Sequence, residues 1–202
     1  MSDFYQQFVT DKSFSLLQAL KGRYKFILIG GWAVYFYTRA LKSKDIDVIV
    51  DFSQLAKLKK EFVLEKNDRL KKYQIKMEAI DIDVYLPYYS DLGFPVEAIG
   101  QRITMVNGFT LPEKEVLLLT KLAAYQGRKG SVKGQKDLID VIGLAALEDF
   151  DCQYFVDLAQ KYRLNKLRDL LKIMIGKTKE VEELNLNCHV FAKKKKDLLV
   201  KL

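Results

Sequence analysis

The chain has 202 residues, of which 49% are hydrophobic and 30% charged, an ordinary composition for a globular protein with one large domain or two small ones. Its formal net charge of +8 favours a polyanionic partner, without distinguishing nucleotides, RNA, DNA and an acidic membrane surface. Two cysteines exclude a disulfide framework, and a single histidine, His189, argues against a zinc site.

The sequence shows no sign of a membrane-spanning or secreted protein. No apolar stretch reaches the length of a transmembrane helix. The N-terminus, Met1 to Phe4, lacks the basic region and apolar core of a secretion signal. We therefore expect a soluble, cytoplasmic protein with reduced cysteines and no membrane contact.

The first 111 residues alternate between helical and strand patterns. In chain order they predict a helix over 4–21, a strand over 25–29, a helix over 32–41, a strand over 46–50 and one or two surface helices over 53–72. The strict apolar–polar alternation from Ile80 to Leu86 predicts another strand. Residues 103–111 are typical of a hairpin around Asn107-Gly108.

The rest of the chain has helical patterns. Thr110 to Glu113 fits a capping box with proline in the first turn, which predicts a helix start there. Helices are predicted over 113–126, 135–147, 151–161 and 164–178, with a flexible basic loop over 127–134. The sequence therefore predicts an α/β (α+β) fold, with a mixed domain over 1–111 followed by a helical domain over 112–202.

Asp45 and Asp47 stand two residues apart at the start of the predicted strand 46–50. Because strand side chains alternate, both point to one face, about 6–7 Å apart. Two like charges so close repel each other and resist burial, and a divalent cation such as Mg²⁺ removes that conflict. The other interpretation is a pair of solvated strand-end residues, since Asp-x-Asp also occurs at 81–83 and 149–151.

Gly30-Gly31 lies where the strand 25–29 becomes the helix 32–41. Glycine lets the backbone approach a phosphate closely, and a helix N-terminus supplies free N–H groups and a partial positive charge. A tight strand-to-helix connection explains the glycines equally well. Together with Asp45 and Asp47, they predict a site for nucleotide phosphates and a divalent metal.

Asp81 and Asp83 share one face of the predicted strand 80–86. If this strand neighbours 46–50, one of the two acids completes a three-carboxylate site suited to phosphoryl-group chemistry. We favour Asp83 and keep Asp81 as the alternative. The other interpretation is a polar edge strand.

Lys121 lies within an apolar helical stretch, where it either extends to the surface or contacts a phosphate. Asp137 lies in the first turn of the next helix, where acids are favoured in any case. Taken alone, both residues fit a structural role better than a catalytic one. The basic residues around them have two interpretations, a path that binds nucleic acid or triphosphate and an ordinary solvated loop. These residues are Arg128, Lys129, Lys133 and Lys136.

These residues together resemble the nucleotidyltransferase-fold superfamily, which includes polymerase beta-like and antibiotic-modifying transferases. Its motif is a Gly-Gly or Gly-Ser turn, an Asp-x-Asp strand and a third acid on a later strand, matched by Gly30-Gly31, Asp45/Asp47 and Asp83. The sequence is most similar to the AbiEii-type branch, the transferase toxins of toxin–antitoxin and phage-defence systems. That branch carries a serine two residues before the acid pair, matched by Ser43.

The resemblance covers roughly residues 25–147 and includes a later motif. The matching residues are Leu111-Pro112-Glu113, Leu117-Leu118, Lys121, Ala124 and Lys136-Asp137-Leu138-Ile139-Asp140. One departure is Leu41, which stands where the branch often has an arginine. Lys42 and Arg39 are the basic residues nearby that would substitute for it.

The resemblance implies transfer of NMP from an NTP, such as ATP or GTP, to an acceptor hydroxyl on RNA or protein. It also implies Mg²⁺ or Mn²⁺ as the cofactor and a cognate antitoxin protein as a further partner. By the resemblance, Asp45, Asp47 and Asp83 ligate the metal, and activation of the acceptor hydroxyl is the alternative role for Asp83. Gly30, Gly31 and Ser43 bind the triphosphate. Lys121 and Asp137 position the nucleotide and the acceptor.

Two other functions stay open. A non-catalytic nucleotide- or nucleic-acid-binding module of the same fold fits the basic charge and the missing arginine. An adenylyltransferase acting on small cationic molecules would need an acidic pocket, and the basic loop near Lys129 argues against it.

Overall fold

The computed structural model describes residues 2–184 and 188–202. The chain divides into two compact units. The first comprises Met1–Phe36, Lys42–Asp91 and Pro95–Pro112, and the second comprises Tyr37–Leu41, Leu92–Phe94 and Glu113–Leu202. None of the helices in the described ranges has the length and apolarity that crossing a bilayer requires.

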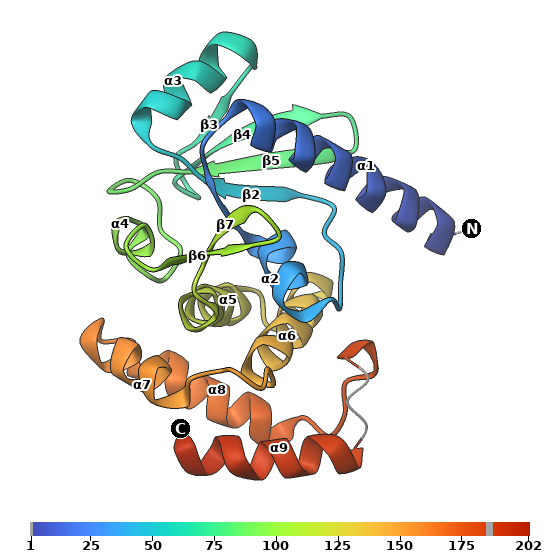
Figure 1. Cartoon of the computed structure of the whole chain (residues 1–202), viewed down its shortest axis with the longest axis vertical. Helices are drawn as coiled ribbons and strands as arrows, with labels where there is room; N and C mark the ends of the chain where they lie inside the picture. Colours follow the sequence, from blue (N-terminus) through green and yellow to red (C-terminus); the bar gives the residue numbers. More distant parts are fainter. Residues whose placement is uncertain (1, 185–187) are drawn as a thin grey trace. The chain divides into compact units, whose positions relative to one another are not determined.

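The first unit is built on a five-stranded mixed sheet (Figure 1), with the strand order β1-β2-β5-β4-β3. β2 and β5 run parallel, and the other neighbouring strands are antiparallel. The strands are β1 (Ile27–Ile29), β2 (Ile46–Ile49), β3 (Glu65–Asn67), β4 (Lys72–Met77) and β5 (Ile80–Tyr85). The unit also holds a hairpin of β6 (Ile103–Val106) and β7 (Phe109–Pro112).

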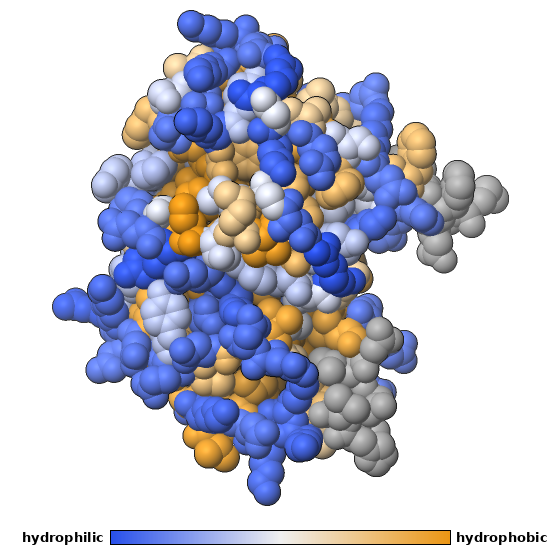
Figure 2. Space-filling view, in the orientation of Figure 1, coloured by the Kyte–Doolittle hydropathy of each residue, from blue (hydrophilic) through white to orange (hydrophobic). Residues whose placement is uncertain are grey.

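Four helices belong wholly or mainly to the first unit. They are α1 (Ser2–Arg23), α2 (Gly30–Thr38), α3 (Phe52–Glu61) and α4 (Val96–Ile99). Trp32 of α2 attaches to α1, because its indole nitrogen donates a buried hydrogen bond of 3.0 Å to Ser13 Oγ. In α3, Leu55 and Leu58 are buried, while hydrophilic side chains cover its outer side (Figure 2, top).

The alternation predicted for the strand 80–86 is confirmed in β5. Ile80, Ile82 and Val84 are buried, whereas Asp81 and Asp83 are half-buried on the other face. One face of the sheet is therefore apolar and belongs to the core, and the opposite face carries the acids.

The second unit is helical in its long C-terminal segment. Its helices are α5 (Lys114–Arg128), α6 (Val132–Ala145), α7 (Cys152–Lys161), α8 (Asn165–Lys177), the short 3₁₀ helix η1 (Glu182–Leu184) and α9 (Cys188–Lys201). The four helices expected between residues 113 and 178 are confirmed, and α9 is an addition. The predicted fold class, a mixed sheet with helices followed by a helical segment, is confirmed.

The interpretation of 53–72 as surface helices is correct only for its first half. After α3 ends at Glu61, residues 65–67 form the edge strand β3, which pairs with β4. This strand has only three residues, all polar, so it lacks the apolar alternation by which strands are recognised. A short, charged edge strand also resists pairing with another chain.

The predicted capping box at Thr110 is wrong. Thr110 belongs to β7, whose pairing with β6 continues to Pro112, and α5 begins at Lys114 without a side-chain cap. The expected flexible loop over 127–134 is also wrong, since only residues 129–131 separate α5 from α6. Gly134 lies inside α6, where a Cβ atom would lie 2.3 Å from the Arg128 carbonyl oxygen, so this glycine allows close packing and is not a sign of a loop.

Candidate functional site

The register of β2 against β5 brings two predicted acids side by side. Asp47 and Asp83 are Cα partners in these parallel strands, and such partners point to the same face of a sheet. Asp45 lies in the bend immediately before the first residue of β2, and its charge acts on Asp83. The condition set by the sequence, that the strand 80–86 neighbours 46–50, is therefore met.

Asp83 is held by two donors from β4. Lys72 Nζ forms an ion pair with Asp83 Oδ2, and Gln74 Nε2 donates a 3.1 Å hydrogen bond to Asp83 Oδ1. Burial raises the pKa of Asp83 above its ordinary value, Lys72 opposes that rise, and the charges of Asp45 and Asp81 add to it. The third acid of the predicted trio thus already has a cationic partner within the protein.

Sequence reasoning missed Lys72 and Gln74. Both lie on β4 and alternate with Tyr73, so they share one face of the strand, and Gln74 is the Cα partner of Asp83. The period-two spacing of these polar residues was visible in the sequence. What the sequence lacked was the register of β4 against β5.

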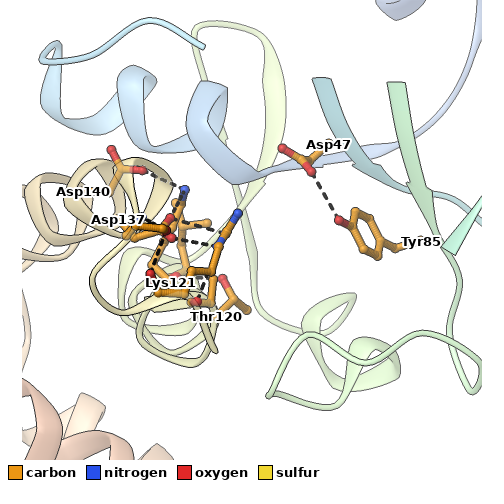
Figure 3. A network of polar contacts seen from close by, with 11 residues as sticks. Asp47, Tyr85, Thr120, Lys121, Asp137 and Asp140 are labelled. Atoms are coloured by element: carbon orange, nitrogen blue, oxygen red, sulfur yellow. Dashed lines mark hydrogen bonds and ion pairs between the residues drawn. The ribbon is translucent and has the colours of Figure 1, made fainter. Parts of the chain in front are cut away.

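Asp47 is positioned by Gly30 and Tyr85. Ile29 is the Cα partner of Asp47, so Gly30 follows directly beside the carboxylate. Gly30 has a positive φ of 67°, and a Cβ atom there would lie 2.1 Å from Asp47 Oδ2. The Tyr85 hydroxyl donates a 3.3 Å hydrogen bond to Asp47 Oδ1 (Figure 3). Gly30 therefore makes room for this carboxylate, a role more specific than a flexible turn.

The other predicted phosphate-binding residues lie close by in sequence. α2 begins at Gly30, so the partial positive charge of its N-terminus lies beside Asp47, where it favours negative charge. Gly31 is buried in the first turn of this helix. Ser43 is buried as well, in the segment that leads to β2.

The structure gives different places to the two basic residues considered as substitutes for the missing arginine. Lys42 Nζ lies 2.6 Å from Asp11 Oδ1 of α1, and this hydrogen bond raises the pKa of Lys42. Arg39 has a positive φ of 58° and belongs to the other compact unit. In this structure, then, Lys42 is engaged with α1.

The residues of the first unit suit a hard cation by their chemistry. Mg²⁺ is typically held by one or two carboxylates together with substrate phosphates and water. Asp45 Oδ1 is buried and accepts no hydrogen bond from the described residues. No group of three acidic, histidine or cysteine side chains is arranged as a metal site within 2–184 and 188–202. The side chain of His189, the single histidine, lies outside the described residues.

In the second unit, Lys121 of α5 is buried between two acids of α6. Lys121 Nζ lies 2.7 Å from Asp140 Oδ2 and 3.5 Å from Asp137 Oδ1 (Figure 3). Arg128 Nε lies 3.0 Å from Asp137 Oδ2. The Oδ2 atoms of both acids lack a well-oriented hydrogen bond, yet each lies beside a cationic nitrogen, so these contacts are ion pairs. Lys121 is only 8% exposed and does not extend to the surface.

Burial also raises the pKa of Asp137, whereas Lys121 and Arg128 oppose the rise. Asp137 and Asp140 are three residues apart on α6 and therefore lie on one side of the helix. That spacing could have indicated a shared cation, but the choice of Lys121 and Arg128 depends on how α5 and α6 pack. The structure thus joins Lys121 to Asp137, as two of the predicted site residues, within the second unit.

No protein-family model and no curated protein matches the chain. Among the solved structures that resemble it is an antigenic nucleotidyltransferase-like protein from Paracoccidioides brasiliensis, with 18% identity and a TM-score of 0.43 over 81% of this chain and 92% of that one. JHP933 from Helicobacter pylori has 13% identity and a TM-score of 0.48 over 95% of this chain and 89% of that one. A candidate nucleotidyltransferase from H. pylori has 15% identity and a TM-score of 0.47 over 97% of this chain and 92% of that one. At these identities and TM-scores the likenesses establish neither a family nor an activity.

Proposed function

We propose that the protein is a metal-dependent nucleotidyltransferase that moves NMP from an NTP to an acceptor hydroxyl on RNA or protein. The observation that carries this proposal is the pairing of Asp47 with Asp83 on neighbouring parallel strands, with Asp45 in the bend directly before β2. Carboxylates gathered at one end of a strand pair, beside a glycine bend, fit the needs of nucleotide triphosphate chemistry.

Asp45 and Asp47 would hold Mg²⁺ or Mn²⁺, which when bound neutralises the triphosphate charge and polarises the α-phosphate. Gly30, Gly31 and Ser43 would bind the triphosphate, aided by the N-terminal N–H groups of α2. Gly30 also keeps Asp47 in place, because its missing side chain leaves the space that the carboxylate occupies.

Asp83 would ligate the metal or accept the proton of the attacking hydroxyl. Lys121 and Asp137 would position the nucleotide and the acceptor if the resemblance extends to them. Their ion pairs within the second unit favour a structural role instead. For this reason the proposal depends on Asp45, Asp47 and Asp83 and not on Lys121 and Asp137.

The direct test is incubation of the purified protein with labelled ATP, GTP, CTP or UTP, Mg²⁺ and either total RNA or total protein. We expect label transfer by the wild type and none by Asp47→Asn. A known nucleotidyltransferase serves as the positive control. Absence of transfer by the wild type, while that control works, would count against the proposal.

The second candidate is a non-catalytic module that binds nucleotide or nucleic acid. The Lys72–Asp83 ion pair favours it, because a carboxylate held by lysine is less available as a third ligand of a catalytic metal. Calorimetry with ATP, with and without Mg²⁺, separates the two functions. Binding that needs no metal and is unaffected by Asp47→Asn would support the module.

We further propose that the protein acts in the cytoplasm as the toxin of a toxin–antitoxin or defence pair. This rests on the AbiEii-type resemblance at Ser43 and at Lys136 to Asp140. The test is growth of cells that express wild type or Asp47→Asn. Growth arrest by the wild type alone, relieved by a co-expressed neighbouring gene, is the expected result, and equal growth of both strains would oppose the toxin role.

A further inference from the structure

We infer that Asp83 is not a ligand of the catalytic metal and that Lys72 serves permanently as its cation. Asp45 and Asp47 alone then hold the metal. Lys72 is a positioning residue, which fixes the Asp83 carboxylate beside Asp47. The inference rests on the proposed function and narrows it, since it assigns the three acids to two different tasks.

Both oxygens of Asp83 are engaged by β4. Lys72 contacts Oδ2, and Gln74 donates to Oδ1 at 3.1 Å. The two donors stand two residues apart on the strand that pairs directly with β5. They therefore approach the carboxylate from one side, from a backbone position fixed by the sheet.

The ion pair is shielded from water. The side chains of Lys72 and Asp83, which join β4 to β5, are 12% and 13% exposed. Those of Lys76 and Glu65, an ion pair that joins β4 to β3, are 58% and 56% exposed. Removing one partner from a shielded pair leaves an uncompensated charge, which costs far more than breaking an exposed pair. A metal that used Asp83 would have to compete for an oxygen that Lys72 or Gln74 already contacts.

Asp45 is in the opposite situation. Its Oδ1 is buried and accepts no hydrogen bond within the described residues, so its lone pairs are available to a cation. Buried acceptors without partners are rare in folded proteins, and a bound ion often satisfies those that occur. Asp45 and the neighbouring Asp47 provide the two carboxylates that Mg²⁺ commonly takes from a protein, with phosphates and water completing its coordination.

This division gives Asp83 a role of its own. A carboxylate held at a fixed place beside the metal-binding pair can accept a hydrogen bond, and then the proton, from the attacking hydroxyl. Lys72 and Gln74 restrict its rotation, which is how a supporting shell maintains the geometry of a reacting group. Lys72 thus affects the reaction through Asp83.

The test is the affinity of the full-length protein for Mn²⁺ alone, measured by electron paramagnetic resonance. The main variant is the double substitution Lys72→Met with Asp83→Asn, which removes the pair together and leaves the net charge unchanged. We expect its Mn²⁺ affinity to stay within about threefold of wild type, whereas Asp47→Asn should lose at least about tenfold. Lys76→Met, on the same strand and face, is the matched control and should match the wild type.

A second variant keeps the test decisive if the double variant does not fold. In Lys72→Arg the guanidinium can hold Asp83 through two hydrogen bonds and so competes more strongly than lysine for the carboxylate. We expect unchanged Mn²⁺ affinity and retained turnover, while Lys72→Met should lose turnover. A tenfold loss of Mn²⁺ affinity in Lys72→Arg or in the double variant would overturn the inference.

The outcome also separates this inference from the proposed function. If Mn²⁺ binds the wild type and Asp47→Asn equally, the metal site itself is wrong and the transferase proposal fails. If Asp47→Asn loses Mn²⁺ and the double variant loses it as well, only the assignment of Asp83 and Lys72 fails.

Discussion

Each unit of the chain places acidic side chains out of water, but the two units compensate the negative charge differently. In the second unit, Asp137 and Asp140 each lie beside a cation, Arg128 and Lys121 respectively. All these contacts join α5 to α6. The buried charges of this cluster are therefore matched by partners within the same pair of helices.

In the first unit the compensation is incomplete. Lys72 is ion-paired with Asp83, whereas Asp45 has a buried oxygen with neither a hydrogen bond nor an ion pair in the described part of the chain. Asp137 is buried more deeply than Asp45, although its charge is compensated within the second unit. Burial of an acid therefore does not by itself mark a functional site. A buried acceptor with neither a hydrogen bond nor a cation beside it is the more informative sign.

The largest expected effect comes from Asp47→Asn. We expect turnover to fall about a thousandfold, since a bound metal contributes several kcal/mol to transition-state stabilisation. The fold should be kept, because the amide has nearly the same shape and the repulsion by Asp45 disappears. Label transfer and thermal unfolding measure the two expectations, and turnover within tenfold of wild type would contradict the assignment.

Lys121→Met tests whether the second cluster is structural. The substitution leaves Asp137 and Asp140 with one cation instead of two, so we expect a loss of about 3–5 kcal/mol in the free energy of unfolding. Urea denaturation measures it. The control is Lys121→Met combined with Asp140→Asn, which should recover part of the loss. Unchanged stability with weakened ATP binding would favour the positioning role that the resemblance implies.

Gly30→Ala probes the contact that positions Asp47. The positive φ of Gly30 costs a residue with a side chain about 1–2 kcal/mol, and the new Cβ atom would displace the Asp47 carboxylate. We therefore expect both lower stability and weaker Mn²⁺ binding. Gly130→Ala is the matched control, because Gly130 also has a positive φ but no atom near the position of a Cβ. It should lose stability without any change in Mn²⁺ affinity.

Features of the fold that depend on local chemistry could be predicted from the sequence. The β6–β7 hairpin was found because Asn107 and Gly108 both adopt positive φ readily, and both do so in the structure. The edge strand β3 could not be found in this way, because its three polar residues are a strand only through pairing with β4. The helix predicted over 113–126 starts within one residue of α5, but the capping box predicted at Thr110 does not form, because the β6–β7 pairing extends to Pro112.

The candidate site follows the same rule. Alternation within each strand predicts that Asp45 shares a face with Asp47 and that Asp81 shares a face with Asp83. The pairing of Asp47 with Asp83 comes from the register of β2 against β5. The ion pair between Lys72 and Asp83 depends on the register of β4 against β5, a non-local property that one sequence does not reveal. The partners of Lys121 depend likewise on the packing of α5 against α6.

The smallest effect is expected at Glu115, a carboxylate of the second unit that is only 4% exposed. Its Oε1 accepts a 2.9 Å hydrogen bond from the Asp151 backbone N–H. Burial raises the pKa of Glu115 from its ordinary value of 4.5, and that hydrogen bond opposes the rise. The folded chain therefore retains a proton on Glu115 to higher pH than the unfolded chain does.

The sign of the pH dependence follows from this difference. Between the ordinary pKa and the raised one, the folded state binds more protons, so the contribution of Glu115 to stability falls as the pH rises. Glu115→Gln does not titrate and keeps an oxygen that can accept the Asp151 hydrogen bond. Its free energy of unfolding relative to wild type should increase through that interval and stay level above it, as urea denaturation at a series of pH values would show. If the relative stability of Glu115→Gln instead falls as the pH rises, a cation compensates Glu115 as Lys121 compensates Asp140. Glu115, Asp137 and Asp140 of the second unit would then all be compensated, in contrast to Asp45 of the first unit.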